Sequence, residues 1–107
     1  MAVARRKWTC YICGDDVVEG QRFTVTSKGF VHLECLYRRI AEKGLSNDIV
    51  AYMDALEVLN YAITRFKEAE LIAASAEVRA ALQETRRVLE AEAAKVTKRL
   101  VEAAGVE

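Results

Sequence analysis

Three cysteines and the only histidine of this chain stand in two close pairs in its N-terminal third. Two residues separate Cys10 from Cys13, eighteen residues follow, and two residues separate His32 from Cys35, which gives the spacing C-x2-C-x18-H-x2-C. Such pairs are typical of segments whose sulfur and nitrogen atoms converge on one metal ion. This pattern constrains the fold more than any other feature, because two distant segments then have to meet at one point.

The residue types favour zinc. A tetrahedral zinc ion takes four sulfur and nitrogen ligands, and Gly14 supplies the tight turn that lets Cys10 and Cys13 face the same ion. An odd number of cysteines would leave one thiol outside any disulfide framework. A thioredoxin-like dithiol would need a βαβ pattern that is missing here, and an iron–sulfur cluster would more often use four cysteines. We therefore expect one structural zinc ion per chain, on Cys10, Cys13, His32 and Cys35.

Between and after these pairs the sequence predicts a hairpin and a short helix. The segment "RFTVT" alternates and is rich in β-forming residues, "SKG" offers a turn at Gly29, and "FVH" continues as a strand. From Cys35 the apolar spacing predicts about two helical turns that end at Gly44. Residues 1–45 are thus expected to form a zinc-binding head.

Residues 46–107 have the composition and periodicity of long helices. Ser46 or Asn47 is expected to cap a first helix, and Ser75 a second one. The first apolar stripe contains Ile49, Tyr52, Leu56, Leu59, Ile63 and Phe66, and the second Val78, Leu82, Leu89, Ala93, Val96, Leu100 and Ala103. An antiparallel, coiled-coil-like hairpin with its turn near residues 73–76 would bury both stripes within one chain, whereas a single helix of about sixty residues would need a partner.

The metal pattern resembles a treble-clef zinc site and, in its spacing, the first zinc-binding half of a LIM domain. Residues 8–36, "WTCYICGDDVVEGQRFTVTSKGFVHLECL", are also similar to a family of small archaeal zinc-binding proteins of unknown function. The resemblance implies the same four ligands and a small α+β treble-clef head, followed here by an α-helical hairpin, so that the chain is mostly α. It departs from LIM domains after Leu36, where no second ligand set follows.

Composition and the closed site exclude several classes of function. The formal net charge is zero and no apolar run approaches the roughly 18 residues of a membrane span, so no membrane partner is expected. The N-terminus lacks a secretory signal, which predicts a cytoplasmic protein. Four protein ligands would leave zinc no open position, and no second histidine is available as a base, so we expect neither an enzyme nor a small-molecule substrate.

Two binding functions remain as hypotheses. The first is a protein interface on the first long helix, nearly opposite its main stripe, at Val50, Val58, Tyr61 and Ile72. Either the head folds back over these residues, or another chain covers them, as a different partner or as a second copy in a homodimer. The alternative is nucleic-acid binding through a basic head, with phosphate contacts from Arg5, Arg6, Lys7, Arg38 and Arg39. Residues 1–46 carry eight Lys or Arg against five Asp or Glu, so only the head has the net positive charge that binding to phosphates requires.

Overall fold

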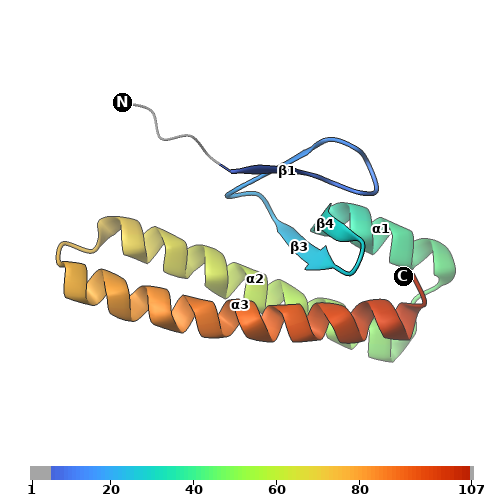
Figure 1. Ribbon diagram of the computed structural model, residues 1–107. Coiled ribbons are helices and arrows are strands. Elements are labelled where there is room, and N and C mark those ends of the chain that lie inside the picture. Colours follow the sequence, from blue (N-terminus) through green and yellow to red (C-terminus); the bar gives the residue numbers. More distant parts are fainter. Residues whose placement is uncertain (1–5, 107) are drawn as a thin grey trace.

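A computed structural model describes residues 6–106. A short head of four strands and one helix precedes a long helical hairpin, and lies along one side of it (Figure 1). The elements in chain order are β1 (Lys7–Thr9), β2 (Asp16–Val18), β3 (Phe23–Thr26), β4 (Gly29–His32), α1 (Leu33–Lys43), α2 (Asn47–Ile72) and α3 (Ala76–Ala104). The predicted fold class, a small α+β head followed by an α-helical hairpin, is confirmed.

The head contains two antiparallel hairpins. In the second, β3 pairs with β4 so that Thr24 lies opposite Val31, and Gly29 takes a φ of 122° just after the turn. This is the hairpin that the sequence predicts. The first hairpin, in which β1 pairs with β2, was not predicted, because strands of three residues are too short to show an alternating pattern. The N–H of Tyr11 donates to the carbonyl of Phe30 at 3.0 Å and joins the two hairpins.

Helix α1 begins two residues earlier than the sequence suggested. It starts at Leu33, directly after β4, and ends at Lys43, where Gly44 takes a φ of 106° that a residue with a Cβ rarely adopts. One face of α1 is fully buried through Leu33, Leu36 and Ile40. This early start places Cys35 within the first helical turn.

The C-terminal segment folds as the antiparallel hairpin, and the single long helix is excluded. The Ser46 hydroxyl accepts from the N–H of Ile49 at 3.2 Å, and the Ser75 hydroxyl accepts from the N–H of Val78 at 3.1 Å, so both helices begin at capping serines. Helix α2 ends at Ile72, which leaves a turn of three residues. Arg86 of α3 makes two contacts with Glu70 of α2, at 2.6 and 3.1 Å, and so holds the helices together near the turn.

The predicted stripe of α3 is buried only in part. Ala93 and Leu100 are buried and Leu89 and Val96 half-buried, whereas Val78 is 51% exposed. Val78 lies in the first turn of α3, where α2 has already ended, and so has little to pack against. Ala103, at the edge of the stripe, is exposed as well. The stripe therefore packs against α2 through its middle and C-terminal part.

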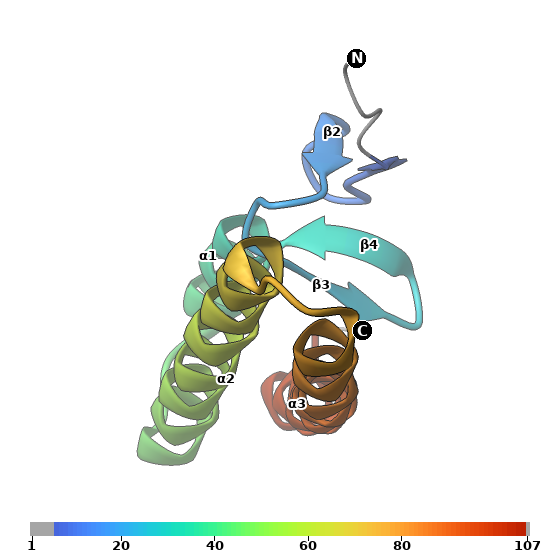
Figure 2. The ribbon, with the colours of Figure 1, turned by 90° about the vertical axis from the view of Figure 1, so that its left-hand side faces the viewer.

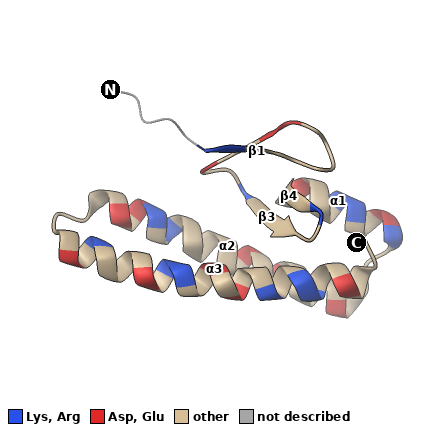
Figure 3. Ribbon diagram, in the orientation of Figure 1, with Lys and Arg blue, Asp and Glu red and all other residues tan. Residues whose placement is uncertain are grey.

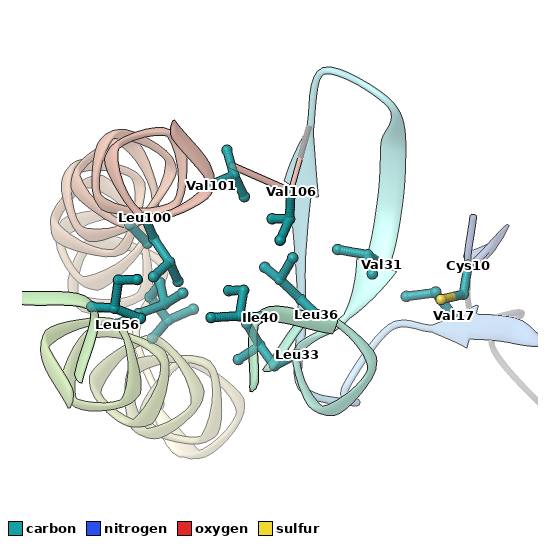
Figure 4. Close-up of a cluster of buried hydrophobic side chains, with 13 residues drawn as sticks. Cys10, Val17, Val31, Leu33, Leu36, Ile40, Leu56, Leu100, Val101 and Val106 are labelled. Carbon is teal, nitrogen blue, oxygen red and sulfur yellow. The ribbon is translucent and has the colours of Figure 1, made fainter. Parts of the chain in front are cut away.

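One continuous core joins the head to the hairpin (Figure 4). Leu56 of α2 and Leu100 of α3 face Ile40 of α1, and the cluster continues through Leu36 to Val31 of β4. Each fully buried leucine contributes roughly 1.5–3 kcal/mol through the hydrophobic effect.

Polar contacts reinforce this attachment. The Thr24 and Thr97 hydroxyls are hydrogen-bonded at 2.8 Å between β3 and α3, both in buried positions. Arg22 forms ion pairs with Glu34 of α1 and Glu57 of α2. Seen along the hairpin, α1 and the β3–β4 hairpin lie on the same side of α2 and α3 (Figure 2). The described part of the head thus covers one side of the hairpin and not the other.

Candidate metal centre

The first ligand pair lies on the turn between β1 and β2. Cys10 follows β1, its N–H donates to the carbonyl of Asp15, and its own carbonyl accepts from the N–H of Gly14, both at 2.9 Å. Gly14 has a φ of 80°, in the left-handed region that favours glycine. This tight turn carries Cys10 and Cys13 on one short loop, as the C-x2-C-G sequence predicts.

The second pair lies at the junction of a strand and a helix. His32 is the last residue of β4 and Cys35 belongs to the first turn of α1. Among residues 6–106, no side chain caps the N-terminus of α1. The dipole of that end favours negative charge nearby, but burial and the neighbouring thiols outweigh it at Cys35, whose pKa is raised.

The four side chains converge as predicted. Their ligand atoms all lie within 4.8 Å of one another, with His32 Nδ1 at 3.4 Å from the sulfur of Cys13 and 3.7 Å from that of Cys35. The other ring nitrogen, Nε2, lies 3.0 Å from the carbonyl oxygen of Asp16. A carbonyl only accepts, so Nε2 carries the proton and Nδ1 keeps a free lone pair towards the sulfurs. The cluster could therefore hold one metal ion.

Asp16 contributes through its backbone, which sequence reasoning missed. A backbone carbonyl has no signature in the sequence. The Asp16 carbonyl reaches His32 only because β2 follows directly after the turn that carries Cys10 and Cys13. Partners of this kind fix the tautomer and the orientation of a ligating histidine.

The three thiols differ in acidity. Burial raises the pKa of Cys10, but hydrogen bonds from the backbone N–H groups of Cys13 and His32 outweigh burial and bring the pKa down from 9.0 to about 6. Burial and the neighbouring Cys13 and Cys10 raise the pKa of Cys35 to about 11. One thiolate therefore forms readily, and a further negative charge is opposed until a cation compensates for it.

The site has a buried side and an open side. Cys10 is 1% exposed, whereas the thiol of Cys13 lies at the surface. A shallow groove beside Cys13 and Cys35 is also lined by Arg22, Glu34 and Arg38. The neighbouring aromatic rings of Trp8 and Phe30 stack at 4.3 Å between centroids, and Phe23 lies 5.5 Å from Trp8.

The basic residues of the nucleic-acid hypothesis lie at two different elements of the described chain. Arg6, Lys7 and Arg38 are exposed and Arg39 is half-buried. Arg6 and Lys7 lie at β1, whereas Arg38 and Arg39 lie on α1. The ammonium group of Lys7 is 3.8 Å from the carboxylate of Asp16. Arg5 is outside the described residues. Figure 3 shows basic and acidic residues intermixed along α2 and α3.

The apolar residues of the protein-interface hypothesis remain at the surface. Val50 is 39% exposed, Val58 and Tyr61 are both 68% exposed, and Ile72 is 85% exposed. Leu71, which the sequence stripe did not include, is 86% exposed beside Ile72. The described part of the head folds back on the hairpin, but on the other side, so it does not cover this face.

Fold and site together define a small class of protein, in which a Cys3His cluster able to bind a metal lies on a head packed against a helical hairpin. Residues 6–102 match the family described as an uncharacterised protein conserved in archaea (DUF2175), and the chain belongs to this family. No curated protein and no solved structure matches the chain. In the part of the chain that is described, no helix is both long and apolar enough to cross a membrane.

Proposed function

We propose that this protein is a non-enzymatic interaction module, in which one zinc ion stabilises the head and the helical hairpin binds a protein partner. The residues at Cys10, Cys13, His32 and Cys35 fit zinc in kind and in spacing. A tetrahedron with zinc–sulfur bonds of about 2.3 Å and a zinc–nitrogen bond of about 2.0–2.1 Å has sulfur–nitrogen edges of about 3.6 Å. The sulfur–nitrogen distances of 3.4 and 3.7 Å agree with that edge.

The donor set also supports a structural role for the ion. Thiolates and imidazole select zinc over calcium or magnesium, which prefer oxygen ligands. Four protein ligands fill every position of a tetrahedral zinc ion, so no water remains to be activated. The three free cysteines must stay reduced to bind the ion, and this suits a reducing cytoplasmic location.

The observation that carries the interaction proposal is the exposed apolar face of α2. Val58 and Tyr61 lie opposite the buried positions Leu56 and Ile63 of the same helix, and neither α3 nor the described part of the head covers them. Large apolar side chains that share one exposed helix face are typical of binding surfaces.

Site-specific crosslinking tests this proposal. A photoreactive amino acid at position 58 is expected to give adducts with protein in native extract, and the same group at Glu84, an exposed position of α3, serves as the matched control. Tyr61→Glu should abolish the adducts, because it adds a charge to the apolar face. If position 58 gives no more adducts than position 84, the interaction proposal is wrong.

Nuclease treatment and added salt distinguish a protein partner from a nucleic-acid partner. A protein contact through an apolar face should survive both nuclease and physiological salt. Binding through phosphates would weaken steeply with salt. Adducts that disappear with nuclease would favour a nucleic-acid partner over our proposal.

A further inference from the structure

The outward face of α2 carries a regular pattern of charge as well as apolar residues. Its spacings are three and four residues, so these side chains lie on one face of the helix. The face, hereafter the outer stripe, consists of Val50, Asp54, Val58, Tyr61, Arg65, Glu68 and Ile72, all exposed. Two opposite charges thus flank an apolar pair at the centre of the stripe.

We infer that the outer stripe pairs with the outer stripe of a second copy, antiparallel and about a two-fold axis. This inference rests on the proposed function, and names the partner. An axis midway between Val58 and Tyr61 sets Val58 against Tyr61 of the partner subunit. The same axis sets Asp54 against Arg65 of the partner subunit, because both pairs have the same midpoint.

The symmetry doubles every contact. Two Val58–Tyr61 contacts form the apolar centre and two Asp54–Arg65 contacts flank it. At 1.5 Å per residue, the charged side chains lie about 8 Å from the axis along each helix, where helices packed 8–10 Å apart are still in contact. Val50 and Ile72 lie about 14 and 19 Å from the axis, and so form the rim.

Other arrangements lose this complementarity. In a parallel pair Asp54 would face Asp54 and Arg65 would face Arg65. The other acidic residues on or beside the stripe, Glu68 and Glu57, do not disfavour the antiparallel arrangement. Glu68 lies 3.0 Å from Arg65 on its own helix, and the register sets it against Ala51 of the partner subunit. Glu57, at the edge, is paired with Arg22 of its own chain.

A self-complementary stripe is what a two-fold interface requires, because one surface has to fit a copy of itself. A different protein would impose no such symmetry on the positions of Asp54 and Arg65. The contact is small, with four side chains of each subunit near the axis, so the dimer should form and dissociate with concentration.

Charge reversal tests the register. Asp54→Arg would set two arginines against each other at both flanks, and Arg65→Asp would do the same with two aspartates. By analytical ultracentrifugation, each single variant should weaken dimerisation at least about tenfold, because two attractive pairs become repulsive. The double variant exchanges the charges, and should return the dissociation constant to within about threefold of the original.

Two controls separate pairing from folding. Glu84→Arg and Arg87→Asp make the same charge changes at exposed positions of α3, and should leave dimerisation unchanged. Arg65→Asp also places an aspartate beside Glu68 on the same helix, which could destabilise the helix. The double variant contains the same pair of acids, so if it dimerises normally, helix destabilisation is not the reason why the single variant dimerises weakly. Each variant should retain its metal content and its helical circular dichroism.

The outcomes distinguish this inference from the function on which it rests. Weakening by the single changes and restoration by the double change would support the antiparallel dimer. A protein that stays monomeric at the highest concentration, or a double variant that remains monomeric, would overturn it. If the monomer still crosslinks to another protein from position 58, the proposed function stands without the dimer, and if it crosslinks to nothing, both fail.

Discussion

Replacing Thr97 with valine is expected to destabilise the fold by about 1–3 kcal/mol, although valine has nearly the same shape as threonine. The hydroxyls of Thr97 and Thr24 form a hydrogen bond of 2.8 Å in positions that are 0% and 9% exposed. Thr97→Val leaves the Thr24 hydroxyl buried without a partner, and such a group costs about 1–3 kcal/mol. Thr24→Val is expected to destabilise the fold by a similar amount, because it leaves the Thr97 hydroxyl buried without a partner.

The double variant gives the decisive comparison. With valine at both positions no polar group is left unpaired, so its stability should lie close to that of the original protein. The coupling free energy is the change for the double variant minus the sum of the two single changes, and is therefore expected to be about 2–6 kcal/mol in favour of the double variant. Thr85→Val is the control, because Thr85 is exposed and bonds only to the carbonyl of Ala81 on its own helix, and it should change stability by less than about 0.5 kcal/mol.

Urea unfolding measures these values in the presence of saturating metal. Trp8 fluorescence reports the head and circular dichroism reports the helices, so both transitions should shift together if the Thr24–Thr97 bond joins the two parts. Single changes that cost nothing, or a double variant as unstable as the sum of both singles, would refute this account of the junction.

Three further predictions concern the site and the hairpin. Cys13→Ala should abolish metal binding and change Trp8 fluorescence, while α2 and α3, which pack on each other, keep most of their circular dichroism; loss of all helical signal would contradict this. Apparent metal affinity should fall at least about tenfold per pH unit as pH decreases from 9 to 7, because the pKa of Cys35 is raised to about 11 and its proton must leave when metal binds. A metal-competition assay would measure this slope. A pH-independent affinity would be evidence against a Cys35 ligand. Arg86→Met should destabilise the hairpin by about 1–2 kcal/mol in thermal unfolding, since the Arg86 and Glu70 side chains are only 17% and 13% exposed. Lys95→Met, at an exposed pair with Glu92, should cost less than about 0.5 kcal/mol. Equal effects would show that burial of the pair does not matter.

The ligands and the long helices could be predicted from sequence because their signals are local. The spacing of Cys10 and Cys13, and of His32 and Cys35, requires only that two short segments meet at one ion. The apolar spacing of α2 follows from the burial of one side of this helix, and Ser75 has the residue type that caps a helix.

The joining of head and hairpin could not be predicted, because it depends on contacts between distant residues. Thr97 is a polar residue in a mainly apolar face, and its burial makes sense only once Thr24, 73 positions away, is known to bond to it. The helical pattern of α2 shows that Val58 and Tyr61 are off the main stripe. It does not show whether the head covers them, and only the fold decides that.

X-ray absorption at the zinc edge of the purified protein tests the central claim most directly. The proposal that Cys10, Cys13, His32 and Cys35 close a structural zinc site predicts one zinc ion per chain with three sulfur neighbours at about 2.3 Å and one nitrogen neighbour at about 2.0 Å. A carefully purified protein without metal, or an ion with an oxygen neighbour from water in place of one of these ligands, would contradict it.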